Sequence, residues 1–289
     1  TISAEMPVRQ MVIRRQDEVG MMARALLEAL RSDIKGAGLS LCYQPKHDRA
    51  GRLVGLEALL RWKSARYGVI PTPVAINLSE DGAYIRQLGD WVLEESCACK
   101  ARWNARGHAG LSLAVNVSPS QLEDTGFARR LETTLRRHRL ASSEIEIEIT
   151  ESQAIPDEAN TNASLAALAD LGVHLSMDDF GMGYSSLSYL KRLAVDKLKI
   201  DQSFVRDMLT GSDGASIVQA IIQLGHNLQL TVIAEGVETM AERDFLERSG
   251  CDEAQGYLFS RPVPVDQIER LLRTGIGRPG GPIEPVHDL

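Results

Sequence analysis

Short apolar runs alternate with longer amphipathic runs along most of this chain, and this alternation limits the possible folds more than any other feature. Apolar residues at every second position predict strands, and apolar residues at helical spacing predict helices. The predicted strands are residues 39–45, 53–60, 111–117, 145–149, 173–177, 196–200, 230–234 and 254–259. The predicted helices are residues 19–30, 90–104, 120–137, 160–171, 185–193, 215–228, 240–249 and 265–274. Strands that alternate with helices favour a parallel sheet covered by helices on its faces.

Eight predicted strands within 289 residues favour a closed barrel over an open sheet. The turn at residues 48–52 joins the first two strands directly, so we expect a hairpin, with Pro45 ending its first strand. The predicted fold class is therefore α/β, a TIM-like (β/α)8 barrel with the first strand antiparallel. We expect a leading helix and linker at residues 1–36, the barrel at residues 37–275, and a Gly/Pro-rich tail at residues 276–289.

The overall charge and the thiols argue against several classes of protein. A formal net charge of −7 argues against a general nucleic-acid-binding surface. No run of roughly 18 apolar residues is present, so we expect no membrane span in this segment. The four cysteines lack zinc-ligand spacing, which favours buried and reduced thiols. Reduced thiols fit a cytoplasmic domain. Because the chain begins at Thr1, we expect it to be excised from a longer protein, which the inner membrane could anchor.

Acidic side chains are concentrated where the predicted strands end, which is where barrels of this kind carry their active sites. Adjacent Asp178 and Asp179 repel each other unless a cation lies between them, although a solvated turn would explain that pair taken alone. Any one of these acids could also pair with an inward lysine or arginine. The polar residues at or near the strand ends are Glu57, Asn116, Glu148, Glu151, Asp178, Asp179, Lys199, Asp201, Glu235, Glu238 and Gln255.

The carboxylates of this set far outnumber its one lysine, Lys199, and such an excess is hard to bury without divalent cations. Ligands that are all oxygen suit Mg²⁺ or Mn²⁺ rather than Zn²⁺. Strand alternation supports the arrangement, since it places Glu146 and Glu148 on the face toward the barrel axis. Two metals that share a carboxylate can bind a phosphoryl group during displacement at phosphorus. Lys199 could then orient the attacking water or stabilise the developing charge.

A series of motifs resembles one known family. Glu57-Ala58-Leu59 stands within residues 55–62 and follows Tyr43-Gln44-Pro45. Further matching motifs are Asn116-Val117-Ser118, Glu148-Ile149-Thr150-Glu151-Ser152, Asp178-Asp179-Phe180-Gly181, Gly183-Tyr184-Ser185-Ser186, Lys199-Ile200-Asp201, Ala234-Glu235-Gly236-Val237-Glu238-Thr239 and Gln255-Gly256-Tyr257. Together they resemble the EAL-domain phosphodiesterases, which hydrolyse cyclic di-GMP to linear pGpG and so end second-messenger signalling. The resemblance covers residues 39–272 in order and spacing.

The resemblance implies a role for each matching residue. It assigns one metal to Glu57, Asn116, Glu148 and Asp178, and a second metal to Asp178 and Asp179. It adds Glu235 to the metal ligands as the proposed general base and implies that Lys199 contacts the attacking water. Two Mg²⁺ or Mn²⁺ ions are the implied cofactors. The catalytic set is then Lys199, Glu235 and Glu57, the substrate contacts are Gln44, Leu59, Arg61, Asp201 and Gln255, and the supporting residues are Glu151, Glu238, Gly181 and Gly183.

The same resemblance implies partners and shows two departures. We expect a homodimer, and residues 17–26 are similar to the end of a HAMP signalling helix, which implies an upstream sensory module; a plain leading helix is the alternative. Met182 replaces the small residue usual at its position, and residues 63–88 lack the usual His-Pro pair. The first departure could alter regulation, and the second could alter local packing or the guanine pocket.

Parts of the sequence also fit other functions. A catalytically silent cyclic di-GMP receptor would keep the fold, although this chain keeps every expected metal ligand. A metal-dependent barrel enzyme acting on a carbon acid is a further alternative, and the combination of Asn116, Asp178-Asp179 and Lys199 weighs against it. For Arg61, a salt bridge on the barrel rim is the alternative to a substrate contact. No Gly-Gly-Asp-Glu-Phe motif is present, so this segment should not synthesise cyclic di-GMP.

Overall fold

The computed structural model describes residues 8–81, 84–151, 159–181, 193–210 and 212–274. The chain divides into two compact units. The smaller unit comprises Thr1–Ser40 with Leu60–Leu88, and the larger unit comprises Leu41–Leu59 with Gly89–Leu289. The predicted boundaries at residues 36 and 275 are not tested by this division and stay predictions.

Eight strands form a closed barrel, which confirms the predicted fold class. They are β1 (Leu39–Asp48), β2 (Leu53–Ser64), β4 (Ser112–Asn116), β5 (Ile145–Thr150), β6 (His174–Phe180), β7 (Lys197–Ile200), β8 (Thr231–Ala234) and β9 (Glu253–Ala254). Neighbours pair in the order β2-β4-β5-β6-β7-β8-β9-β1, and a β1–β2 pairing closes the ring. The strands from β2 to β9 run parallel. Strand β1 is antiparallel to β9, as the hairpin predicted.

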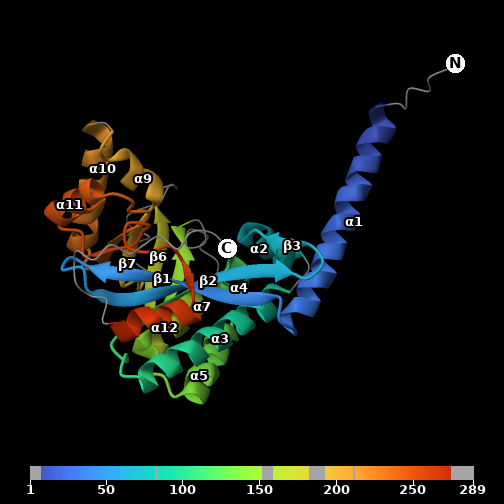
Figure 1. Cartoon of the computed structure of the whole chain (residues 1–289), viewed down its shortest axis with the longest axis horizontal. Coiled ribbons are helices and arrows are strands. Elements are labelled where there is room, and N and C mark those ends of the chain that lie inside the picture. The colour runs from blue at the N-terminus through green and yellow to red at the C-terminus, as the bar shows by residue number, and fades with distance from the viewer. Residues whose placement is uncertain (1–7, 82–83, 152–158, 182–192, 211, 275–289) are drawn as a thin grey trace. The chain divides into compact units, whose positions relative to one another are not determined.

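Helices pack outside this barrel (Figure 1). Those of the larger unit, including the part of α3 that continues from the smaller one, are α3 (Ile85–Ala105), α4 (Pro119–Leu122), α5 (Phe127–His138), η1 (Ser142–Glu144), α7 (Ala159–Leu171), α9 (Gln202–Asp207), α10 (Ser212–Asn227), α11 (Met240–Ser249) and α12 (Val265–Thr274). Helix α3 lies between two neighbours, because Arg137 of α5 pairs with its Glu94 at 2.7 Å and Glu269 of α12 pairs with its Arg106 at 2.5 Å. Helix α10 covers β7 and β8. A short strand, β10 (Val263–Pro264), adds to β1 in antiparallel orientation.

The smaller unit holds the leading helix, α1 (Val8–Ile34), with β3 (Gly68–Ile70), α2 (Thr72–Asp81) and the end of β2. Helix α1 is longer than the predicted 19–30. It is joined to β2 by the Trp62 indole N–H, which donates to Asp33 Oδ2 at 2.8 Å. The atypical segment at residues 63–88 therefore forms a short hairpin strand and a helix within this unit.

Three further predictions about strands and helices were wrong. Strand β1 continues through Pro45 to Asp48. Pro45 lies between the residues of β1 that pair with β10 and those that pair with β9. A proline is tolerated there because neither pairing needs a hydrogen bond from its backbone nitrogen. The predicted helix at 120–137 is two helices, because the Asp124 carboxylate accepts the Gly126 N–H and turns the chain between them. The predicted strand at 254–259 ends at Ala254, and a tight turn follows in which Gly256 lies against the Val237 backbone.

Three other predictions concern one helix, membrane spans and the thiols. The helix predicted at 185–193 falls almost wholly outside the described residues. Among the described residues, no helix is both long enough and apolar enough to cross a bilayer. All four cysteines are free, and Cys97, Cys99 and Cys251 are buried.

Candidate active site

A β-bulge brings the two adjacent aspartates to the same strand end. Strand β6 pairs with β7 at Met177–Leu198 and again at Phe180–Ile200, so Asp178 and Asp179 both lie opposite Lys199. Asp179 adopts a positive φ of 54°, which aspartate tolerates better than most residues. Oxygens of Asp178, Asp179 and Glu235 all lie within 4.8 Å of one another. The bulge thus creates an acidic cluster that a regular strand would have split between two faces.

Lys199 lies at the centre of this cluster and is fully buried. Its Nζ is 3.1 Å from Glu148 Oε1, 3.1 Å from Asp178 Oδ1 and 2.6 Å from Glu235 Oε1. Burial disfavours the charged amine, but these carboxylates outweigh that effect and raise the pKa of Lys199 well above its usual value. Lys199 is therefore a permanent cation that bridges three strands.

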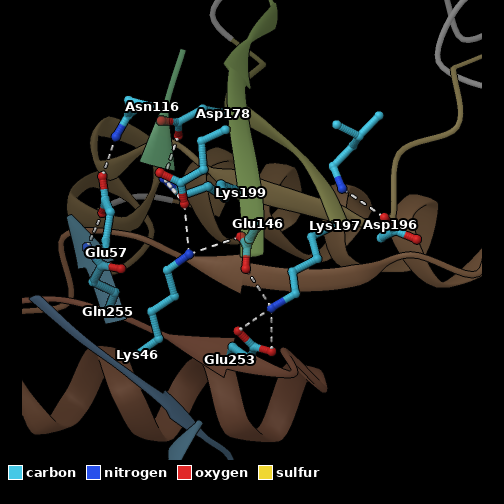
Figure 2. Close-up of polar contacts among 12 residues, drawn as sticks. Lys46, Glu57, Asn116, Glu146, Asp178, Asp196, Lys197, Lys199, Glu253 and Gln255 are labelled. Carbon is cyan, nitrogen blue, oxygen red and sulfur yellow. Dashed lines mark hydrogen bonds and ion pairs between the residues drawn. The ribbon is translucent and has the colours of Figure 1, made fainter. Parts of the chain in front are cut away.

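Glu57 is oriented by side-chain amides from distant parts of the chain (Figure 2). Asn116 Nδ2 donates to its Oε1 at 2.8 Å, and Gln255 Nε2 donates to its Oε2 at 2.5 Å. Gln255 also donates to Gln44 Oε1 at 3.0 Å. Burial opposes ionisation of Glu57, yet Lys199 and Lys46 lower its pKa. Glu57 is thus an ionised carboxylate, and Asn116 keeps its carbonyl oxygen available to bind a cation.

Lys46 and Lys197 were missed from the sequence, because the prediction counted only the lysine at a strand end, Lys199. Lys46 Nζ lies 3.0 Å from Glu146 Oε1 and 2.7 Å from Glu148 Oε1. Lys197 Nζ lies 3.0 Å from Glu146 Oε2 and 3.1 Å from Glu253 Oε1. Figure 2 shows Lys46 and Lys197 on either side of Glu146. Glu146 and Glu148 are fully buried, as strand alternation predicted. The signal for Lys46 was its position two residues after Gln44, on the same face of β1.

The site still carries more negative charge than its lysines neutralise. Burial, with Asp178 next, raises the pKa of Asp179 to about 6. Burial also raises the pKa of Glu235 to about 8, with Asp178 and Glu57 adding to it and Lys199 opposing it. Glu148 Oε2 is buried and has no hydrogen-bond partner among the described residues. Clustered carboxylates and a bare buried oxygen fit a site for divalent cations with oxygen ligands.

Most of the other predicted site residues lie near this cluster. One cleft is lined by Gln44, Glu57, Leu59, Asp178, Gln202, Glu235, Gly236, Glu238, Gln255, Gly256 and Tyr257. Glu151 Oε2 accepts the Gly181 N–H at 2.9 Å, which connects the ends of β5 and β6. Asp201 caps helix α9 by accepting the Ser203 N–H at 2.9 Å.

Three predicted features are not placed in this site. Arg61 belongs to the smaller unit, where its Nη1 donates to its neighbour's carbonyl, Leu60 O, at 2.8 Å. Its role as a substrate contact therefore stays a prediction. Met182 and Gly183 lie outside the described residues.

The fold and the acidic strand ends define a class of barrel proteins whose site suits divalent metal ions. Comparison with known proteins identifies the family. Residues 25–262 match the model of the EAL domain, so the chain belongs to the EAL domain family. MucR of Pseudomonas aeruginosa, named a bifunctional diguanylate cyclase/cyclic di-GMP phosphodiesterase, is 43% identical over 244 residues, which is 84% of this chain and 36% of that protein. Cyclic di-GMP phosphodiesterase PA2567 of the same organism is 39% identical over 259 residues, covering 89% of this chain and 44% of that protein.

A solved structure supports the same family. The PaMucR phosphodiesterase in its c-di-GMP complex matches with a TM-score of 0.79 and 43% identity, covering 84% of this chain and 99% of that chain. The chain spans less than half the length of the two curated relatives named above.

Proposed function

We propose that this chain hydrolyses cyclic di-GMP to linear 5′-pGpG and so terminates signalling by that second messenger. One observation carries the proposal: the oxygens of Asp178, Asp179 and Glu235 converge within 4.8 Å at a strand end. Lys199, buried among them, contacts two of the three. The names of the relatives supply the substrate, and the acidic cluster supports a reaction at a phosphodiester.

The proposed cofactors are two Mg²⁺ or Mn²⁺ ions. Several oxygen ligands, most of them from negatively charged carboxylates, suit these cations. When bound, such ions polarise the phosphoryl group and lower the pKa of water. The residues that would bind them are Glu57, Asn116, Glu148, Asp178, Asp179 and Glu235.

Lys199 and Glu235 are the proposed catalytic residues beside Glu57. The Lys199 amine donates hydrogen bonds only, so it can orient an attacking water and stabilise charge that develops on the phosphoryl oxygens. Glu235 can accept the proton of that water in its ionised form, because it lines the cleft and burial raises its pKa to about 8, which makes its carboxylate a stronger base than an ordinary glutamate. Glu57 contributes through its oriented carboxylate.

The cleft supplies the proposed substrate contacts. Gln44, Leu59 and Gln255 line it, and Arg61 and Asp201 complete the set proposed from the family motifs. Glu151, Glu238, Gly181 and Gly183 are the proposed supporting residues of the site, and the Glu151–Gly181 hydrogen bond is the contact in favour of this role.

The partners belong to the same proposal. We expect a homodimer, and an upstream sensory or HAMP-type module is supported by the greater length of the relatives. Free thiols favour a reducing compartment, so we place the domain in the cytoplasm, with the full-length protein anchored in the inner membrane as one arrangement.

Incubation of the purified chain with cyclic di-GMP and Mg²⁺, followed by chromatography, tests the function. The expected product is pGpG, and EDTA should stop its formation until Mg²⁺ or Mn²⁺ is added back. Binding of cyclic di-GMP without turnover would instead indicate a silent receptor. Turnover that persists in EDTA would exclude the metal-dependent mechanism.

A further inference from the structure

Lys46 is an unusual residue for the interior of a barrel. Its side chain is fully buried, and it comes from β1, which runs antiparallel to its barrel neighbour β9. A buried ammonium is costly unless carboxylates surround it in good geometry. Lys46 meets this condition with Glu146 and Glu148, at 3.0 and 2.7 Å. None of the motifs singled out in the sequence gives Lys46 a role.

Lys46 belongs to a chain of alternating charges along the barrel interior, which we call the lysine–glutamate ladder. Its members, in order of contact, are Glu253, Lys197, Glu146, Lys46, Glu148 and Lys199. The three lysines formally neutralise the three glutamates. Among the proposed metal ligands, four carboxylates lie outside the ladder, namely Glu57, Asp178, Asp179 and Glu235. Their formal charge equals that of two divalent cations with opposite sign.

The contacts of Glu148 are strongly unequal. Lys46 and Lys199 both approach its Oε1, at 2.7 and 3.1 Å. Its Oε2 is buried and without a hydrogen-bond partner among the described residues. A buried carboxylate oxygen without a hydrogen-bond partner loses its favourable interactions with water, so Oε2 is the oxygen of Glu148 on which a further ligand would offset the most lost free energy.

The two lysines differ in how firmly they are anchored. Lys199 shares its contacts among Glu148, Asp178 and Glu235, and two of these belong to the acidic cluster of the site. Lys46 is anchored from the opposite side by Glu146, which Lys197 contacts in turn. Lys46 can therefore keep its position whether or not the cluster binds a ligand.

We propose that Lys46 is a positioning residue for metal binding: it occupies Oε1 of Glu148, so that Oε2 is the oxygen left to bind a divalent cation. This inference rests on the proposed function, because it requires a metal at the acidic cluster. Lys46 itself touches neither substrate nor metal in this account. It acts through Glu148, in the way that residues behind metal ligands commonly orient them.

A simple charge argument predicts the opposite effect of Lys46 on metal affinity, so the two explanations can be distinguished by experiment. Lys46 is a cation near a cation site, so its charge alone weakens metal binding. Loss of Lys46 should then tighten binding if charge decides, and weaken binding if orientation decides. Partners of this kind typically contribute about 10- to 100-fold to metal affinity, so we expect orientation to decide.

The experiment measures Mn²⁺ affinity of the metal-free protein by calorimetry, together with its melting temperature. Lys46→Met leaves Glu146 and Glu148 partly unpaired and should lower the melting temperature by roughly 10 °C. The double variant Lys46→Met/Glu146→Gln removes one charge of each sign, so it should recover most of that stability. We expect both variants to bind Mn²⁺ about 10- to 100-fold more weakly than wild type.

Lys100→Met is the matched control. Lys100 is also fully buried and pairs with Glu144 at 2.5 Å, yet it is not part of the ladder. We expect Lys100→Met to lose stability and to keep wild-type Mn²⁺ affinity. This outcome would separate positioning of the metal site from stability alone.

Wild-type or tighter Mn²⁺ affinity in the double variant would overturn the inference and leave the proposed function intact. Absence of Mn²⁺ binding by the wild type would overturn both. Should neither Lys46 variant fold, a crystal structure of the wild type with Mn²⁺ decides the question. Glu148 Oε2 bound to the ion, with Lys46 on Oε1, supports the inference, whereas coordination through Oε1 refutes it.

Discussion

Lys199 Nζ lies 2.6 Å from Glu235 Oε1, and this ion pair joins the ends of β7 and β8 inside the barrel. The pair places a permanent cation beside a carboxylate whose pKa is raised to about 8, chiefly by burial. The cation is therefore available wherever charge develops on a bound phosphoryl group. The catalytic part of the proposed function depends on this pair.

Replacement of Lys199 by methionine should reduce kcat by roughly 100- to 1000-fold, the usual effect of removing one preorganised charge donor. The methionine fills similar space but supplies no charge. Steady-state turnover of cyclic di-GMP gives the measurement, and Lys100→Met serves as the control for loss of a buried lysine. Retention of wild-type kcat by Lys199→Met would exclude a catalytic role.

Replacement of Glu57 by alanine should abolish measurable turnover, with a loss of at least roughly 100-fold in kcat/KM. The change removes a proposed metal ligand, together with the acceptor of the Asn116 and Gln255 amides. Glu94→Ala is the control, since Glu94 pairs with Arg137 on the outside of the barrel. Wild-type turnover by a correctly folded Glu57→Ala protein would refute the site.

Replacement of Gly181 by alanine should impair both stability and turnover. Gly181 has a φ of +101°, and a Cβ there would lie 2.7 Å from the Phe204 ring. The strained loop would disturb the turn that follows Asp178 and Asp179, and we expect a loss of more than about 1 kcal/mol in unfolding free energy. Gly107→Ala is the control, because Gly107 has a φ of +93° but nothing within 4 Å of the added Cβ. Equal losses of turnover in the two variants would argue against a specific role of the loop.

His47 should make the barrel less stable in mild acid. Burial, with Arg243 adding to it and Asp48 opposing it, lowers the pKa of His47 to about 4, and its ring stacks on Phe259 at 4.6 Å. In the unfolded state His47 binds a proton at about pH 6.5, whereas in the folded state it binds one only at about pH 4. The free energy of unfolding therefore falls as the pH is lowered from about 6.5 toward 4.

The variant His47→Gln removes this titration. Between pH 7 and pH 5 we expect it to lose about 2 kcal/mol less unfolding free energy than the wild type. Denaturant unfolding at the two pH values gives the difference directly. An identical loss in both proteins would show that His47 does not titrate as its burial predicts.

Much of the barrel could be predicted because its signals are local. The alternation at Ile145, Ile147 and Ile149 set the inward direction of Glu146 and Glu148, and all five side chains are buried. The turn at residues 48–52 predicted the antiparallel first strand, which the pairing of β1 with β9 confirms.

Long-range contacts could not be predicted in the same way. The amide from Gln255 reaches Glu57 across 198 residues of sequence, and no local pattern encodes that contact. The bulge at Asp178 and Asp179 depends on the register between β6 and β7. Lys46 was missed because a strand ended at Pro45 would place it in a loop, whereas the strand continues past the proline.

The central claim is that the acidic end of the barrel binds two divalent cations that engage a phosphodiester. Anomalous diffraction from crystals grown with Mn²⁺ tests it most directly. The account predicts two Mn²⁺ peaks among Glu57, Asn116, Glu148, Asp178, Asp179 and Glu235. The same acids paired only with lysines or open to solvent, with no peak among them, would contradict it.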